Sequence, residues 1–288
     1  MILRAAGLVI TLVALLPVGC TLEVREPAAA TVVAAAHPDT LPLRIPTDAT
    51  IPEGAHGASI RRGRAILMAT GDSLPGFVGN DLRCTSCHLD AGTRAWSAPW
   101  VGVYSRFPQY RSRNATVNLI EDRINDCLQR SLGGKPLPRD HPAMRDIIAY
   151  MGWLSVDYPV GGVVRGEGFD RFGPLDPDTV AGREVFAVEC ARCHGPSGQG
   201  SELGPPVWGD RSFTIGAGMA RLRTAAAFIH RNMPFDQPGT LSEQQAYDVA
   251  AYVTRQPRRD FPGKELDWPL GDHPPDVGYR TRAMGPPK

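Results

Sequence analysis

The sequence lacks an apolar run long enough to cross a membrane, and it carries almost no net charge. Its charge-free, mostly apolar N-terminal stretch covers only residues 5–18, whereas a membrane-spanning helix needs about 20 residues. The formal net charge of +1 gives no indication of nucleic-acid binding. The composition shows no coiled-coil, collagen-like or disordered bias. A chain of 288 residues instead predicts a globular protein of about two domains.

The short apolar run has the pattern of an export signal. Arg4 precedes it, and it ends just before Cys20, which follows a small residue. This ending resembles the lipobox of bacterial lipoproteins, in which the cysteine becomes acylated. Because Pro17 replaces the usual leucine, ordinary cleavage within residues 28–30 is the alternative. Both interpretations predict a signal peptide over residues 1–20 and a periplasmic protein, which a lipidated Cys20 would anchor to the membrane.

Four of the six cysteines form two Cys-x-x-Cys-His motifs. In such a motif the two thiols reach the two vinyl groups of one porphyrin, and the following histidine binds the iron. A thioredoxin-like pair would not require that histidine, and a zinc site would need further ligands. The sequence therefore predicts two covalently bound haem c groups, attached through Cys84, Cys87 and His88 and through Cys190, Cys193 and His194.

The sequence around the two motifs is also repeated. Similar strings that start at Gly63 and Gly182 precede the motifs, and apolar residues at helical spacing follow them in residues 144–151 and 246–253. This order predicts an all-α fold of two tandem cytochrome c-type domains, each helical around one haem. The expected parts are an irregular segment 21–50, domain 1 over 51–156, a linker 157–178, domain 2 over 179–258 and an irregular tail 259–288.

The repeat also predicts the second axial ligand of each iron. Met233 follows His194 by 39 residues, and Cys127 follows His88 by the same 39 residues. We therefore expect a His88/Cys127 haem and a His194/Met233 haem. A thioether ligand favours Fe(II), which would suit the second haem for electron exit. Other candidates are Met68 and Met144 for the first iron and Met219 for the second, and Cys127 could instead be a buried core residue.

Arginines accompany Cys127 in the sequence. Arg123, Cys127 and Ser131 are spaced i, i+4, i+8 along a predicted helix, whose apolar stripe is at residues 117, 120, 124 and 128. Arg111 and Arg113 lie in the preceding loop. A thiolate beside guanidinium groups has a lowered pKa and can attract a small oxyanion. The alternative is a solvated helix face on which Arg123 pairs with a carboxylate three residues further on.

These strings resemble the dihaem c-type thiosulfate dehydrogenase family, the tetrathionate-forming type. The similarity is densest in residues 84–90, 99–104, 107–113 and 121–127. The resemblance implies that two thiosulfate ions are oxidised to tetrathionate, in a reaction that can also run in reverse, through a covalent adduct on the sulfur of Cys127. It further implies that Arg113, Arg123 and Ser131 bind the substrate.

The resemblance also implies an electron path. Domain 1 would hold the active-site haem and domain 2 the electron-relay haem, and an external acceptor, such as another cytochrome c or a high-potential redox protein, would receive the electrons. Some members have a lysine ligand immediately before the methionine. Asn232 occupies that position here, which favours Met233 as the permanent ligand.

Three other functions fit part of the pattern. A non-catalytic dihaem electron-transfer subunit would not need arginines beside a ligating thiol. A dihaem peroxidase would need one iron with an open coordination site. A cytochrome that processes a sulfur carrier would also use a cysteine-ligated haem, but it would act on a protein-bound substrate.

Overall fold

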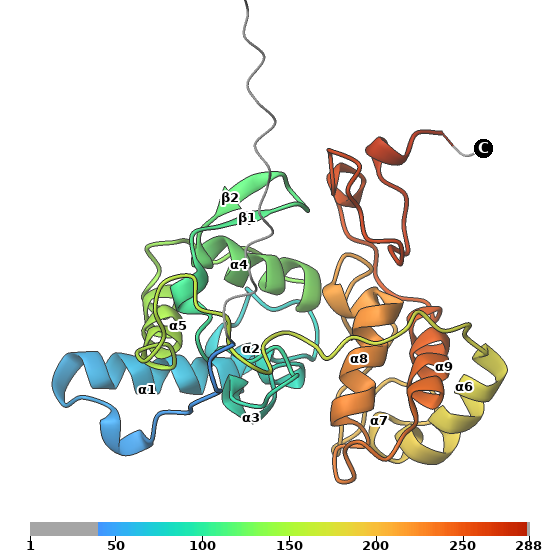
Figure 1. The fold of residues 1–288 in the computed structure, drawn as a ribbon, viewed down its shortest axis with the longest axis horizontal. Helices are drawn as coiled ribbons and strands as arrows, with labels where there is room; N and C mark the ends of the chain where they lie inside the picture. Colours follow the sequence, from blue (N-terminus) through green and yellow to red (C-terminus); the bar gives the residue numbers. More distant parts are fainter. Residues whose placement is uncertain (1–39, 287–288) are drawn as a thin grey trace, which may run out of the picture. The chain divides into compact units, whose positions relative to one another are not determined.

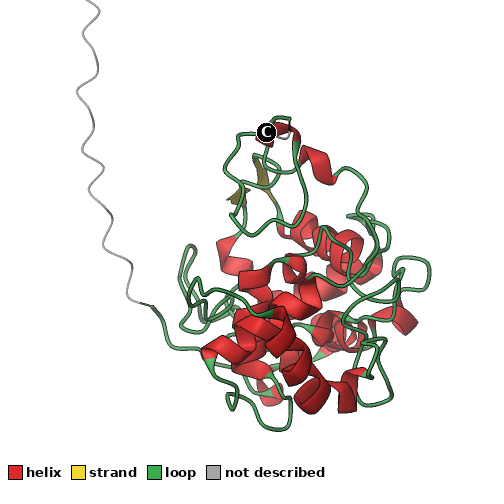
Figure 2. Ribbon diagram, turned by 90° about the vertical axis from the view of Figure 1, so that its right-hand side faces the viewer, coloured by secondary structure: helices red, strands yellow, loops and turns green. Residues whose placement is uncertain are grey.

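The computed structural model describes residues 40–286, in which the regular secondary structure is almost all helical and the helices are joined by long loops (Figure 2). The expected export signal and Cys20 lie outside these residues. Within the described part of the chain, no helix has both the length and the apolar character to cross a membrane. The α-helices are α1 (Gly54–Met68), α2 (Thr70–Ser73), α3 (Leu89–Gly92), α4 (Ile120–Asp126), α5 (Pro142–Trp153), α6 (Thr179–Val185), α7 (Ala191–His194), α8 (Leu222–Asn232) and α9 (Glu243–Thr254).

Shorter elements complete the fold. Two antiparallel strands, β1 (Gln109–Arg111) and β2 (Thr116–Asn118), form a small hairpin. Two π-type turns, Cys127–Ser131 and Phe186–Cys190, extend α4 and α6. Single 3-10 turns cover Asp48–Thr50, Cys84–Ser86, Tyr104–Arg106, Gly218–Ala220, Lys264–Leu266 and Arg282–Met284.

In the first half of the chain, α1 packs directly across α5 (Figure 1). Gly63 lies at the crossing, where a Cβ atom would stand 1.9 Å from the carbonyl oxygen of Asp146. Only glycine therefore lets the two backbones approach this closely. The carboxylate of Asp146 accepts hydrogen bonds from Ser59 and Arg62 of α1, so polar contacts reinforce the same crossing.

The second half of the chain repeats this arrangement with α6 and α9. A Cβ atom at Gly182 would stand 2.1 Å from the carbonyl oxygen of Asp248, and α8 packs on α9 as well. The helix α9 begins directly after Ser242, which forms a reciprocal capping box with Gln245. The glycine strings of the sequence repeat are thus the points at which the paired helices cross.

The apolar interior forms one large cluster and two small ones. The large cluster is built mainly from the first half and includes Leu67, Leu128 and Tyr150. Phe213 and Ala217 from the second half also belong to it. The second half of the chain also contains two smaller clusters. One consists of Phe186, Trp208, Val249 and Val253, and the other of Ala225, Ala226, Tyr247 and Ala250.

The region before Cys127 differs from the sequence-based expectation. Arg111 belongs to strand β1 and not to a loop, so the fold is not purely helical. The predicted helical stripe started at Val117, but this residue lies in β2 and is 65% exposed. The helix begins three residues later because the Asp122 carboxylate accepts a hydrogen bond from the backbone N–H of Leu119, which caps the first turn.

Candidate functional site

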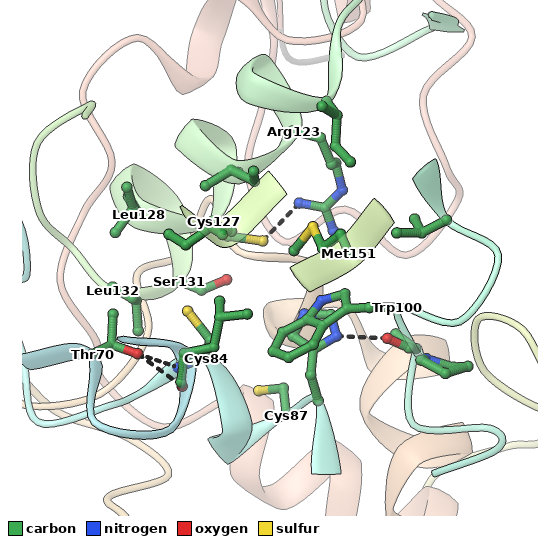
Figure 3. A pocket seen from close by; sticks show the side chains of 18 of the residues that line it. Thr70, Cys84, Cys87, Trp100, Arg123, Cys127, Leu128, Ser131, Leu132 and Met151 are labelled. Atoms are coloured by element: carbon green, nitrogen blue, oxygen red, sulfur yellow. Dashed lines mark hydrogen bonds between the residues drawn. The ribbon is translucent and has the colours of Figure 1, made fainter. Parts of the chain in front are cut away.

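A cavity of about 210 Å³ lies beside the first Cys-x-x-Cys-His motif (Figure 3). Cys84, Cys87 and His88 of the motif line it together with Cys127 and Ser131 from the segment that follows α4. The rest of the lining is mostly apolar and includes Leu67, Leu74, Leu82, Trp100, Val101, Ile124, Leu128, Leu132, Ile147 and Met151. The predicted haem-attachment residues and the predicted catalytic cysteine therefore share one apolar chamber.

Hydrogen bonds orient the histidine of this motif. Its Nδ1 lies 2.6 Å from the carbonyl oxygen of Ala98, so Nδ1 carries the proton and Nε2 is left to bind a metal. The ring also stacks on Trp100, with 4.9 Å between ring centroids. Ser97 donates to the carbonyl oxygen of Cys87 at 2.7 Å and ties the same loop to the motif. These contacts hold the His88 imidazole in one orientation.

The residues fit a covalently bound haem. Burial raises the pKa of Cys84 and of Cys87 to about 12, so both side chains are neutral thiols without a disulfide partner. The histidine has a free Nε2, and the chamber between these groups is apolar. Two unpaired thiols, one imidazole nitrogen and an apolar cavity are the donor set and the surroundings that a haem c requires.

Cys127 has a different electrostatic environment. Burial alone would raise its pKa, but the positive charge of Arg123, together with the nearby His88 imidazole, outweighs burial and lowers the pKa to about 7. Arg123 Nη1 donates to Cys127 Sγ at 2.7 Å (Figure 3). Arg123 thus contacts the thiol and not the carboxylate of Asp126, which lies 3.6 Å from Arg130 instead. The site stabilises a thiolate on the wall of an apolar cavity.

The C-terminal end of the Cys127 segment is held by residues distant in sequence. The backbone closes a π-type turn over Cys127–Ser131, a feature that often marks functional sites. Thr214 donates through both its N–H and its hydroxyl to the carbonyl oxygen of Arg130, at 3.1 and 2.8 Å. Asn80 donates to the carbonyl oxygen of Ser131 at 2.9 Å. Carbonyl groups that a helix end leaves unpaired are therefore satisfied by tertiary contacts.

The structure separates the predicted substrate residues. Arg123 and Ser131 line the cavity beside Cys127, as their spacing predicts. Arg113 is not part of this lining, and its Nη1 donates to the carbonyl oxygen of Gly216 at 2.6 Å. Arg111 donates to the neutral side chain of Gln109 at 3.0 Å. Burial and the nearby charge of Arg123 lower the pKa of Arg111, which shows that positive groups are gathered here.

Sequence reasoning missed a polar pair that lines the same cavity. Arg106 forms an ion pair with Glu167, which belongs to the segment predicted as a linker. Residues 166–168 run along the loop before Trp100, where the N–H groups of Trp96 and Ala98 donate to Gly166 and Gly168 at 2.7 Å. A lone glutamate in a Gly- and Pro-rich stretch carries no local pattern, so nothing in the sequence indicated this role.

The second motif repeats the histidine geometry of the first. His194 Nδ1 lies 2.7 Å from the carbonyl oxygen of Pro205, and Ser201 donates to the carbonyl oxygen of Cys193 at 2.6 Å. Burial lowers the pKa of His194, which keeps the ring neutral with Nε2 available. Cys190 packs against the small apolar cluster around Trp208. The same donor set is thus present a second time.

The candidate methionines lie in different surroundings. Met233 directly follows α8, as the C-cap of that helix. Its competitor Met219 packs against the large apolar cluster, which belongs mainly to the first half of the chain. Met144 is fully buried in that cluster and does not line the cavity, and Met68 is 47% exposed.

Comparisons with known proteins agree with this double arrangement. Residues 79–160 match the family model for the SoxA/TsdA cytochrome c domain, and residues 177–253 match that for subunit III of cbb3-type cytochrome c oxidase. These matches confirm the predicted fold class of two cytochrome c domains and the two covalently bound haem c groups.

Relatives match most of the chain. It is 45% identical over 242 residues to a thiosulfate dehydrogenase of Psychrobacter arcticus, covering 82% of this chain and 74% of the relative. It is 46% identical over 238 residues to a thiosulfate dehydrogenase of Allochromatium vinosum, covering 79% and 88%. The solved thiosulfate dehydrogenase TsdBA of Marichromatium purpuratum superimposes with a TM-score of 0.73 and 34% identity, over 76% of this chain and only 50% of that one. The chain therefore belongs to the thiosulfate dehydrogenase family and is a c-type cytochrome oxidoreductase.

Proposed function

We propose that this protein oxidises two thiosulfate ions to tetrathionate at Cys127, in a reaction that can also run in reverse, and passes the two electrons to an external acceptor. The observation that carries the proposal is the 2.7 Å contact of Arg123 Nη1 with Cys127 Sγ, on the wall of the first haem cavity. A thiol used only for packing would not need a guanidinium group within hydrogen-bond distance of its sulfur. The names of the curated relatives indicate the substrate.

Electrostatics explains why arginines are needed. Two unit charges 4 Å apart repel by about 1 kcal/mol in water and by about 4 kcal/mol at an effective dielectric constant of 20, and two dianions multiply this about fourfold. Arg123 and the nearby Arg111 offset that repulsion. Burial and the charge of Arg123 lower the pKa of Arg111, and an anion bound between the two cations would relieve their repulsion.

The chemistry then divides into two steps. The outer sulfur of the first thiosulfate forms a bond to Cys127 Sγ, and two electrons leave the pair. The outer sulfur of the second thiosulfate attacks the bound sulfur, the bond to Cys127 breaks, and tetrathionate departs while the thiolate returns. Arg123 stabilises that thiolate as leaving group, and the Ser131 hydroxyl is available to donate to a sulfonate oxygen. Forming the adduct first turns a three-body encounter into two simpler ones.

When bound, the haems would supply two one-electron acceptors. We infer that His88 and Cys127 would hold the iron of the first haem and that His194 and Met233 would hold the iron of the second. The free Nε2 of each histidine supports the first ligand of each pair. The matching 39-residue spacing supports Cys127 and Met233, and the packing of Met219 against the other cluster favours Met233 over it.

The remaining inferences concern location and partners. We infer a periplasmic location from the two haem c motifs and from the export-signal pattern, and lipidation of Cys20 as the mode of membrane attachment. The external acceptor would be another cytochrome c or a high-potential redox protein. In the alternative, non-catalytic role, the protein would relay electrons without consuming thiosulfate.

A direct assay separates the two roles. The purified protein with both haems is supplied with thiosulfate and ferricyanide, and tetrathionate is measured as the product. We expect one tetrathionate for every two ferricyanide ions reduced, and an electron paramagnetic resonance signal of a thiolate-ligated low-spin haem. If the protein exchanges electrons with ferricyanide but forms no tetrathionate, and that signal is absent, it is an electron-transfer subunit.

A further inference from the structure

The C-terminal segment, residues 259–286, is the red end of the chain in Figure 1. It contacts Arg113 and the turn that contains Cys127. Its centre is Asp267, whose side chain is only 5% exposed. Arg130, in the turn that contains Cys127, donates to both carboxylate oxygens of Asp267 at 2.8 and 2.7 Å. Tyr279 donates to the same carboxylate at 2.6 Å. The tail is thus fastened to the Cys127 segment by a buried, bidentate ion pair.

The same carboxylate holds Arg113. Arg113 Nη1 lies 3.4 Å from Asp267 Oδ2, and its guanidinium stacks over the ring of Trp268 with 4.6 Å to the centroid. The backbone is fixed as well, since Trp268 N–H donates to the carbonyl oxygen of Arg113 at 2.7 Å. The residue is therefore held through its backbone, the face of its guanidinium and Nη1.

One edge of this guanidinium is left open. Both protein hydrogen bonds of the group start from Nη1, while Nε and Nη2 donate to no acceptor within residues 40–286. These two nitrogens are not buried without a partner either, so they are accessible from outside the protein. A guanidinium held at one nitrogen, with its other edge free, is suited to bidentate binding of an oxyanion.

We propose that Asp267 is a positioning residue for a thiosulfate-binding position that adjoins the Cys127 cavity. It holds Arg113, which lies outside the lining of that cavity, beside Arg130 of the Cys127 turn, so that the free edge of Arg113 can bind a thiosulfate ion. The proposal rests on the function proposed above and extends the site to the C-terminal tail. The Asp267 carboxylate also balances part of the positive charge of Arg113 and Arg130. The two arginines therefore remain close together although like charges repel.

The test uses the full-length protein with both haems and the variant Asp267→Asn. This change keeps the shape of the side chain and removes its charge. Without the carboxylate, Arg113 is no longer held in place to donate its charged hydrogen bond to the anion. We therefore expect the KM for thiosulfate to rise about tenfold, while kcat changes less than twofold. Asp267→Glu should restore most of the affinity. Asp260→Asn is the matched control, because the ion-pair partner of this exposed tail carboxylate is Lys264 and not Arg113 or Arg130, so the KM of this variant should equal that of the wild type.

A double-variant cycle distinguishes positioning from general support of the fold. If Asp267 acts through Arg113, adding Asp267→Asn to Arg113→Gln should raise KM no further. If Asp267→Asn fails to fold, Tyr279→Phe removes one hydrogen bond to the same carboxylate and should raise KM by about two- to threefold. An unchanged KM in the folded variants, or fully additive effects, would overturn the proposal. Absence of tetrathionate formation by the wild type would instead refute the proposed function itself.

Discussion

The replacement Arg123→Gln tests most directly whether the thiolate site is catalytic. Glutamine keeps a hydrogen-bond donor near Cys127 but removes the positive charge that now lies 2.7 Å from Sγ. Because that charge is a main cause of the lowered pKa of the thiol, the variant loses the stabilisation of the thiolate as nucleophile and as leaving group.

The structure sets the size of the effect. At 2.7 Å and an effective dielectric constant of 20, the attraction between two unit charges is about 6 kcal/mol, which is an upper limit. The desolvation of the guanidinium and the remaining charge of Arg111 offset much of it. A hydrogen bond to a charged group contributes about 1.5–3 kcal/mol net, and each 1.4 kcal/mol corresponds to a factor of ten in rate. We therefore expect kcat/KM for thiosulfate to fall by about 10- to 100-fold.

Steady-state kinetics with ferricyanide as acceptor measure this change, and visible absorbance confirms that both haems are attached. Arg139→Gln is the matched control. It removes the same charge from an arginine that forms a surface ion pair with Asp122 of α4, so its kcat/KM should stay within twofold of the wild type. A value for Arg123→Gln within threefold of the wild type, with both haems attached, would refute the electrostatic role of Arg123.

Three further predictions concern single residues. Cys127→Met should keep both haems and abolish tetrathionate formation, measured by product analysis; retained activity would make Cys127 a packing residue. Met233→Leu should abolish the absorbance of a methionine-ligated ferric haem, whereas Met219→Leu should preserve it; the reverse result would exchange their roles. Gly63→Ala should lower the melting temperature by about 5 °C, because a Cβ would meet a carbonyl oxygen at 1.9 Å and overpacking costs about 1–3 kcal/mol. Gly152→Ala, in open space on α5, should not lower it, and equal effects in calorimetry would contradict the helix-crossing argument.

Features that depend on the local spacing of residues can be predicted from the sequence. The Cys-x-x-Cys-His motifs and the helical repeats predicted two cytochrome c domains with two haem c groups, which the family matches confirm. The spacing of Arg123, Cys127 and Ser131 placed them along one cavity wall. The axial ligation by Cys127 and Met233 stays a prediction that the spectroscopic variants test.

Local spacing also misled in one place. The stripe that ends at Leu128 continued in the sequence back to Val117, but a capped helix start at Ile120 and a hairpin before it place Val117 in solvent. Periodicity alone does not show where a helix begins, because an apolar residue at the right spacing can belong to a strand. The carboxylate of Asp122, which caps the first turn, was the sequence signal for the boundary.

The sequence by itself determined the covalent chemistry of this protein, because haem attachment depends on thiols and an imidazole within five consecutive residues. Only the tertiary structure decided which charges surround that chemistry. Arg113 and Asp267 are 154 positions apart, Arg130 and Asp267 are 137 apart, and Arg106 and Glu167 are 61 apart. An ion pair has no sequence period, so the partners of a guanidinium follow from how distant segments pack. The two haem motifs look alike in sequence, and within the described residues the first is distinguished by Cys127 and its hydrogen-bond partner Arg123, which line the adjoining cavity.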